Sequence, residues 1–101
     1  MAPVSAKVVT IITAFEAREL VLTAFAVLGV RGFSTSRVEG VGVHGHRRSG
    51  LVEAENLVFV IVASEELAER VLEWVGKHLV SHYASIAYST NARAVAAKPI
   101  A

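Results

Sequence analysis

The sequence predicts one α+β domain in which two helices cover one face of a four-stranded antiparallel sheet. Four segments are rich in Val, Ile and Thr, which is typical of strands. Two further segments carry apolar residues at helical spacing. Their order along the chain is β-α-β-β-α-β, and right-handed crossovers fold this order into the ferredoxin-like sandwich. A length of 101 residues fits a single domain, which we place at residues 1–101.

The first strand is expected over residues 4–13, which contain no turn-forming residue. Thr13 lies three residues before Glu16, and this capping-box pattern predicts that the first helix starts at Thr13. Gly29 is expected to end this helix. Its buried stripe is predicted from apolar residues at helical spacing, namely Ala17, Leu20, Val21, Ala24 and Leu28.

The remaining elements are predicted in the same way. A second strand is expected over residues 32–41 and a fourth over residues 85–95. Residues 54–63 are almost wholly apolar, which predicts a central third strand covered on both faces. Ser64 followed by two glutamates predicts the N-cap and first turn of the second helix. The buried stripe of that helix is predicted at Ala68, Val71, Leu72, Val75 and Leu79.

Composition and charge exclude several classes of protein. Hydrophobic residues make up 53% of the chain, too many for a disordered protein and more than a small monomer needs. We therefore expect sheet faces to pack together in an oligomer. The formal net charge of +1 argues against a protein held to nucleic acid by its overall field. The chain has no cysteine and no recognisable signal peptide or membrane span, so we expect a cytoplasmic protein without disulfides or thiolate metal sites.

The aromatic residues fall into two groups. Trp74 and the four phenylalanines (Phe15, Phe25, Phe33 and Phe59) have core-like spacing. Tyr83 and Tyr88 flank the start of the last strand, where a ligand could stack. No set of Ser, His and Asp has a persuasive spacing for nucleophilic catalysis, so we do not expect an enzyme.

Glycines and cations gather between the second and third strands. Residues 40–45, GVGVHG, match the G-x-G-x-x-G pattern, but no helix is expected after them, so we reject a dinucleotide-binding fingerprint. The glycines still allow the main chain to approach a ligand closely, and the alternative is a flexible hairpin loop. The side chains of His44, His46, Arg47 and Arg48 can hold phosphate or carboxylate, and the alternative is a solvated loop tip.

The four histidines raise a second hypothesis, a metal site. His44 and His46 could chelate a metal, and His78 and His82 have an i, i+4 spacing that suits one if the second helix continues to His82. The alternative is a cationic helix C-terminus, in which His78 and Lys77 interact favourably with the helix dipole.

The run GVRGFSTSRVEGVGVHG, residues 29–45, resembles the PII signal-protein family. In that family a strand with the pattern Gly-x-x-Gly-hydrophobic-Thr-x-x-x-Val-x-Gly-x-Gly leads into the long T-loop. Residues 83–88, YASIAY, are similar to a run in the PII-like branch typified by SbtB and carboxysome-associated proteins. The residues that keep the register of the family's strand are Gly29, Gly32, Phe33, Ser34, Val38, Gly40 and Gly42.

The resemblance implies a homotrimer that binds an adenine nucleotide in the clefts between its subunits. Ser34 and Val62 then lie beside the adenine, and the loop at residues 42–52 is a short T-loop that signals to a partner. That partner is a membrane transporter of bicarbonate or another small anion, or an enzyme or other component of carbon fixation. The nucleotide-binding residues expected from the resemblance and from side-chain chemistry are Ser34, Gly40, Gly42, His44, Arg47, Arg48, Val62 and Tyr88.

Two departures from the family affect the expected ligand. Residues 79–86 lack the glycine and lysine with which the family's B-loop holds phosphates. The family's paired C-terminal arginines fall at Ala96 and Lys98, so one of them is lost. We therefore expect AMP, ADP or cyclic AMP rather than ATP, with bicarbonate as a further candidate ligand. The trimeric, metal-binding CutA group, with loop and helix-end histidines as ligands, is the alternative.

Overall fold

The computed structural model describes residues 1–40 and 54–100. A 3-10 turn (Phe15–Ala17) leads into the first helix, and a π-helical turn (Val75–Leu79) continues the second. The order of elements and the α+β class expected from the sequence are confirmed. In chain order the elements are β1 (Val4–Ala14), α1 (Arg18–Leu28), β2 (Ser34–Gly40), β3 (Ala54–Ala63), α2 (Glu65–Trp74) and β4 (Ser85–Ala94).

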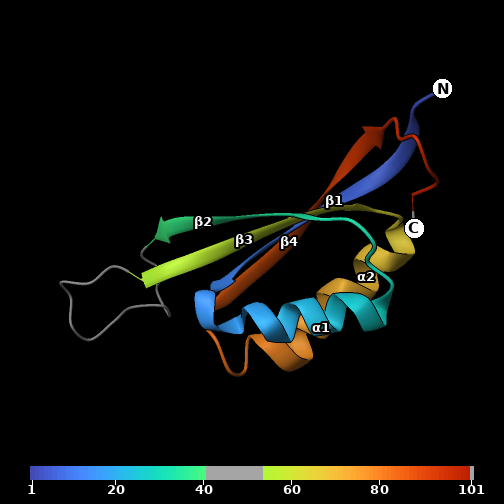
Figure 1. The fold of residues 1–101 in the computed structure, drawn as a ribbon. Helices are drawn as coiled ribbons and strands as arrows, with labels where there is room; N and C mark the ends of the chain where they lie inside the picture. The colour runs from blue at the N-terminus through green and yellow to red at the C-terminus, as the bar shows by residue number, and fades with distance from the viewer. Residues whose placement is uncertain (41–53, 101) are drawn as a thin grey trace.

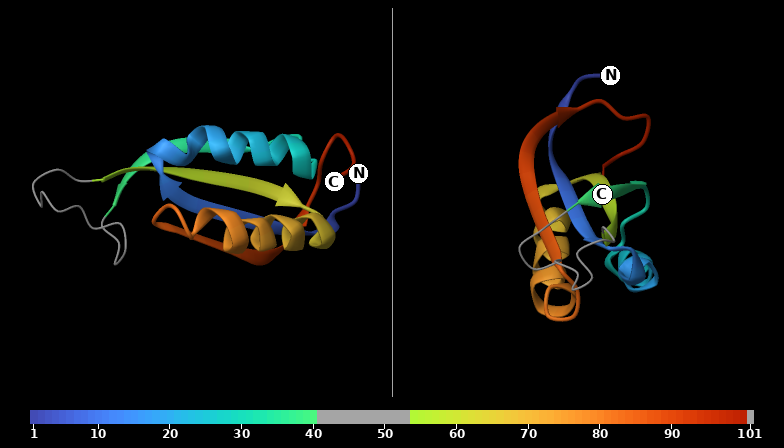
Figure 2. Two further views of the ribbon diagram at one scale, coloured as in Figure 1. Left: turned by 90° about the horizontal axis from the view of Figure 1, so that it is seen from below. Right: turned by 90° about the vertical axis from the view of Figure 1, so that its left-hand side faces the viewer.

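The four strands form one antiparallel sheet in the order β2-β3-β1-β4. Both helices lie side by side on the same face of this sheet (Figures 1 and 2). The register places Ser34 opposite Val60, Val60 opposite Thr10, and Thr10 opposite Tyr88. Because directly opposed residues point to the same side, these four form one row across the face that the helices leave open.

The core lies between the sheet and the helices, and it contains the aromatic rings of Phe25 and Phe59, with Phe33 at its margin. The ring centroid of Phe25 in α1 lies 5.4 Å from that of Phe33 and 5.6 Å from that of Phe59, with edge-on geometry in both pairs. Phe25 and Phe59 are buried, and Phe15 and Trp74 pack against the core while partly buried. Phe33 was also expected in the core, but it is 41% exposed, because it lies on the connection that leads into the edge strand β2.

The predicted start of the first helix at Thr13 is wrong. β1 continues to Ala14, and α1 begins at Arg18 with no side-chain cap. The Thr13 side chain is buried and pairs with the last strand instead, because its Oγ1 lies 2.7 Å from the Oγ of Ser85. The Ser85 hydroxyl in turn donates to the carbonyl oxygen of Tyr83 at 3.1 Å. Long-range pairing of β1 with β4 therefore overrides the local capping signal.

The predicted end of the first helix at Gly29 is confirmed. Gly29 has a φ of 94°, and the N–H groups of Gly29 and Val30 both donate to the carbonyl oxygen of Phe25. The predicted stripe is only partly correct, since Leu20 is 39% exposed and Phe25 takes a fully buried position instead.

The predictions for the second helix are confirmed. The Leu67 N–H donates to the Ser64 hydroxyl at 3.1 Å, which makes Ser64 the N-cap. Four residues of the predicted stripe are buried and Leu72 is half-buried. The widened final turn carries a hydrogen bond from the Val80 N–H to the Val75 carbonyl, which keeps Val75 and Leu79 in the core.

The second face of the sheet is apolar and has no layer over it in the described part of the chain. Val62, Ile86 and Tyr88 are 48%, 57% and 48% exposed there, although their neighbours on the same strands are buried or half-buried. β3 is central, as expected, but the predicted cover on both faces is wrong for the described residues, which cover only one of them. Two helices can cover one face alone, so the other is available to a further protein surface.

Replacing Phe25 by alanine is expected to lower the free energy of unfolding by about 3–5 kcal/mol, because it removes a ring from the centre of the core. Val27 is 82% exposed on the same helix, so Val27→Ala is the matched control, with an expected change under about 0.5 kcal/mol. Urea unfolding at one fixed protein concentration, followed by circular dichroism, measures both variants. An equal effect of the two substitutions would contradict this description of the core.

Candidate functional site

A cavity of about 320 Å³ lies at the end of the sheet where β2 begins and where β3 and β4 end. One wall is the connection between α1 and β2, residues 30–32, and another is the end of β3, residues 61–63. The C-terminal segment, residues 94–100, bends back over the same end of the sheet and closes the third side (Figure 1). The cavity is thus formed mainly by three segments that are far apart in the sequence, and Leu67 of α2 also lines it.

The walls of this cavity are apolar, apart from two cations. Val30, Ile61 and Val62 supply hydrophobic surface, and of the described residues that line the cavity only Arg31 and Lys98 are charged. No carboxylate is among those lining residues. An apolar cavity with a few converging polar groups is the usual form of a small-molecule site, and two cations favour an anionic ligand.

The position of Arg31 is set by the end of α1. The left-handed Gly29 and the hydrogen bonds from Gly29 and Val30 to Phe25 turn the chain sharply out of the helix. Val30 then packs against the core, which fixes the residue before Arg31. Gly32 follows, and a Cβ at Gly32 would meet nothing within 4 Å, so the chain is unobstructed there.

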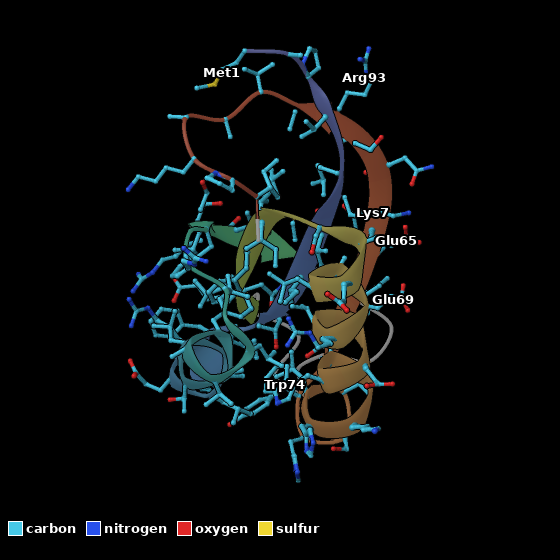
Figure 3. All side chains as sticks on the ribbon, turned by 90° about the vertical axis from the view of Figure 1, so that its right-hand side faces the viewer. Met1, Lys7, Glu65, Glu69, Trp74 and Arg93 are labelled. Carbon is cyan, nitrogen blue, oxygen red and sulfur yellow. The ribbon has the colours of Figure 1, made fainter. Side chains whose placement is uncertain are left out.

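A larger hollow of about 700 Å³ lies beside the N-terminus of α2, but its charges compensate one another. It is lined by Lys7, Arg93 and Glu65, which Figure 3 shows along this side of the molecule. The Lys7 ammonium donates to the Asn91 side-chain oxygen. Charges of both signs and an existing partner for Lys7 make this hollow a weaker anion site than the smaller cavity.

The structure places two of the expected nucleotide-binding residues at the end of the sheet that holds the cavity. Val62 lines the cavity, and its side chain is about half exposed. Ser34 is exposed at the first position of β2, two residues after Gly32. These two positions therefore lie at the same end of the fold.

Gly40 and Tyr88 lie elsewhere. Gly40 is the last residue of β2, six residues from Ser34, so the two are separated by about 20 Å along an extended strand. Tyr88 lies on β4 at the opposite side of the sheet, three strand spacings or about 14 Å from Ser34. Gly42, His44, Arg47 and Arg48, with the rest of the loop at 42–52, lie outside the described residues.

Arg37, three residues before Gly40, contacts side chains from two other segments. Its guanidinium carbon lies 4.5 Å from the centroid of the Phe15 ring, and its Nη1 lies 3.4 Å from a carboxylate oxygen of Glu55. Arg37 thereby connects the 3-10 turn after β1 with β2 and β3. A Cβ on Gly40 would lie 3.3 Å from the side-chain nitrogen Nδ2 of Asn56, so the Asn56 side chain packs over Gly40.

The structure does not support the helix-end metal hypothesis. The π-helical turn ends at Leu79, and His82 lies in the turn that follows, so the i, i+4 geometry on a continuous helix is absent. His78 instead lies beside Trp74, with 6.2 Å between ring centroids. Within residues 1–40 and 54–100, no group of three or more His or Glu side chains is arranged so that it could hold a metal ion. His44 and His46 lie outside the described residues.

No helix among the described residues is long and apolar enough to cross a bilayer.

The model of the nitrogen regulatory protein P-II family matches residues 6–97. The chain belongs to the P-II family. It is similar to a solved protein of Thermus thermophilus designated a PII-like signalling protein, with 32% identity, a TM-score of 0.77, and 94% of each chain covered. No match is found among curated proteins.

The fold is also that of CPII, a nitrogen regulatory PII-like protein from Thiomonas intermedia. A structure of CPII bound to ADP, AMP and bicarbonate has a TM-score of 0.78 at 18% identity, covering 98% of this chain and all of that one. The apo form of CPII has a TM-score of 0.64 at 16% identity, covering 93% of this chain and 98% of that one. The PII assignment made from the glycine pattern is thus confirmed at the level of the family.

Arg31, which lines the cavity, was not predicted from the sequence. Arg31 is the one charged residue within residues 20–36 of the sequence. It lies between Gly29 and Gly32, two glycines of the family pattern. Those two features are the only sequence signal that could have drawn attention to it.

Proposed function

We propose that this PII-like regulatory protein binds an adenine nucleotide of the AMP, ADP or cyclic AMP type at the cavity, in a cleft completed by a second subunit. Several observations support the proposal: the family, the ADP and AMP bound by CPII, and a cavity that combines apolar walls with two cations. The role is regulatory rather than catalytic, and we expect it to be carried out in the cytoplasm.

The distance between the expected site residues is the main support for a cleft between subunits. Ser34 and Val62 lie at one end of the sheet and Gly40 at the other, about 20 Å away, which is too far for one nucleotide within one chain. A ligand can contact both groups if the Gly40 end of one subunit meets the Ser34 end of the next. The open apolar face of the sheet supplies the surface for such association, and we propose a homotrimer.

Each residue then has a distinct role in the proposed cleft. Ser34 and Val62 contact the adenine, and the main chain at Gly40 and Gly42 approaches the nucleotide from the neighbouring subunit. His44, Arg47 and Arg48 supply cations for phosphate. Tyr88 lies on the open face, where subunit contact rather than base stacking suits its place in the row with Thr10.

The output of the proposed regulator is the loop at residues 42–52, which begins two residues after Gly40. A nucleotide bound near Gly40 changes the surroundings of both ends of this loop, since β2 and β3 are paired at its base. We propose that the loop contacts a partner such as a transporter of bicarbonate or another small anion, or a component of carbon fixation. Bicarbonate, which CPII binds, is a candidate second effector here.

Calorimetric titration tests the nucleotide proposal. The wild-type protein is expected to bind AMP and ADP more tightly than adenosine, because phosphate adds charge-assisted hydrogen bonds. Arg47→Ala is expected to weaken AMP and ADP by about ten- to a hundredfold and to leave adenosine unchanged. Equal affinities throughout, or no binding by either protein, would refute the proposal. Zn²⁺ and Cu²⁺ titrated in the same series test the metal alternative.

The subunit arrangement is tested by Ile86→Arg, which places a charge on the open face where Ile86 is 57% exposed. The variant is expected to shift the wild-type trimer toward monomer in sedimentation at micromolar concentration and to lose nucleotide affinity in parallel. Val27→Arg, at an exposed position of α1, is the control and should leave both properties unchanged. A wild type that sediments as a stable monomer would show that the cleft is not formed between subunits.

A further inference from the structure

Arg31 and Lys98, the two cations that line the cavity, form no ion pair or hydrogen bond with the described residues. The ion pairs found in that part of the chain are Arg18 with Glu19 and Arg37 with Glu55, and neither includes Arg31 or Lys98. Neither side chain has a hydrogen bond within residues 1–40 and 54–100 either. Two unpaired positive groups therefore line one small cavity that contains no described carboxylate.

The two cations reach the cavity from different directions. Arg31 comes from the connection after α1, whose path is fixed by the Gly29 cap and by the packing of Val30. Lys98 comes from the C-terminal segment, which bends back across the ends of β3 and β4. Both residues are exposed, so an anion in the cavity can be contacted by a cation from each of two segments.

We infer that Arg31 is a specificity-determining residue of this site and that, together with Lys98, it holds the first phosphate of the bound nucleotide. The inference rests on the proposed nucleotide function and extends it to a residue with no assigned role. The guanidinium of Arg31 can donate two parallel hydrogen bonds to phosphate oxygens, whereas Lys98 acts as a point charge. Arg31 thus supplies a second cation where the C-terminal pair of the family pattern is reduced to Lys98.

The inference concerns the first phosphate because Arg31 and Lys98 line the same cavity as Val62, against which the base is proposed to lie. The phosphate bonded to the ribose is the one that AMP and ADP share. AMP and ADP should therefore depend on Arg31 to the same degree, and adenosine should not depend on it.

The test is a set of titrations of AMP, ADP and adenosine into wild-type protein and four variants. Arg31→Ala is expected to weaken AMP and ADP by the same factor, about ten- to a hundredfold, with adenosine unchanged. Arg31→Lys keeps the charge but loses the planar fork, so an intermediate loss is expected. Lys98→Ala is expected to weaken AMP and ADP as well. Arg70→Ala is the matched control, because Arg70 is an exposed arginine of α2 that does not line the cavity.

The possible outcomes separate the inference from the function on which it rests. If the wild type binds AMP and ADP but Arg31→Ala behaves like Arg70→Ala, the role of Arg31 is refuted and the nucleotide function stands. If Arg31→Ala weakens adenosine as much as AMP, the residue shapes the cavity and does not bind phosphate, which also overturns the inference. If the wild type binds no adenine compound, both fail. Circular dichroism and sedimentation of each variant show that fold and assembly are retained, and Arg31→Lys provides the result if Arg31→Ala does not fold.

Discussion

The structure depends on one constraint: a four-stranded sheet has two faces, and the two helices of this chain can cover only one. Alternate side chains of β1 and β3 close the core against α1 and α2. Most of the other side chains of the same strands are also apolar, so the open face offers a surface to a further protein. The proposed association of subunits follows from this shortage of cover. The proposed site is therefore inseparable from the assembly that would complete it.

The elements that could be predicted from sequence are those that local chemistry decides. Ser64 caps α2 because its hydroxyl meets an N–H three residues away, and Gly29 ends α1 because its main chain adopts a left-handed conformation. Thr13 had an equally good local signal, but it lies in a strand that pairs with β4 near the far end of the chain. The hydroxyl of Ser85, 72 residues away, decides what Thr13 does. No local pattern contains that contact.

The candidate site likewise contains residues that could be predicted from the sequence and one that could not. The glycine pattern led to the family, and through it to Ser34 and Val62, which lie at the cavity end of the sheet. Arg31 could not be found in this way, because its importance depends on a C-terminal segment that bends back to bring Lys98 to the same cavity. The length of β2 could be counted from the sequence, but only the pairing of the strands shows that Ser34 and Gly40 lie at opposite ends of a straight edge.

The polar edge strand β2 has a consequence for how copies of this protein associate. Its first four residues are Ser34, Thr35, Ser36 and Arg37, and Glu39 follows, so the outer edge of the sheet carries hydroxyl and charged groups. Charged and polar edges discourage strand-to-strand addition, which can continue without limit and leads to fibres. Contacts through an apolar face are instead exhausted after a few copies, because each subunit has one such face to cover. The distribution of polarity in this small sheet thus favours closed assembly over aggregation, even though more than half of the chain is hydrophobic.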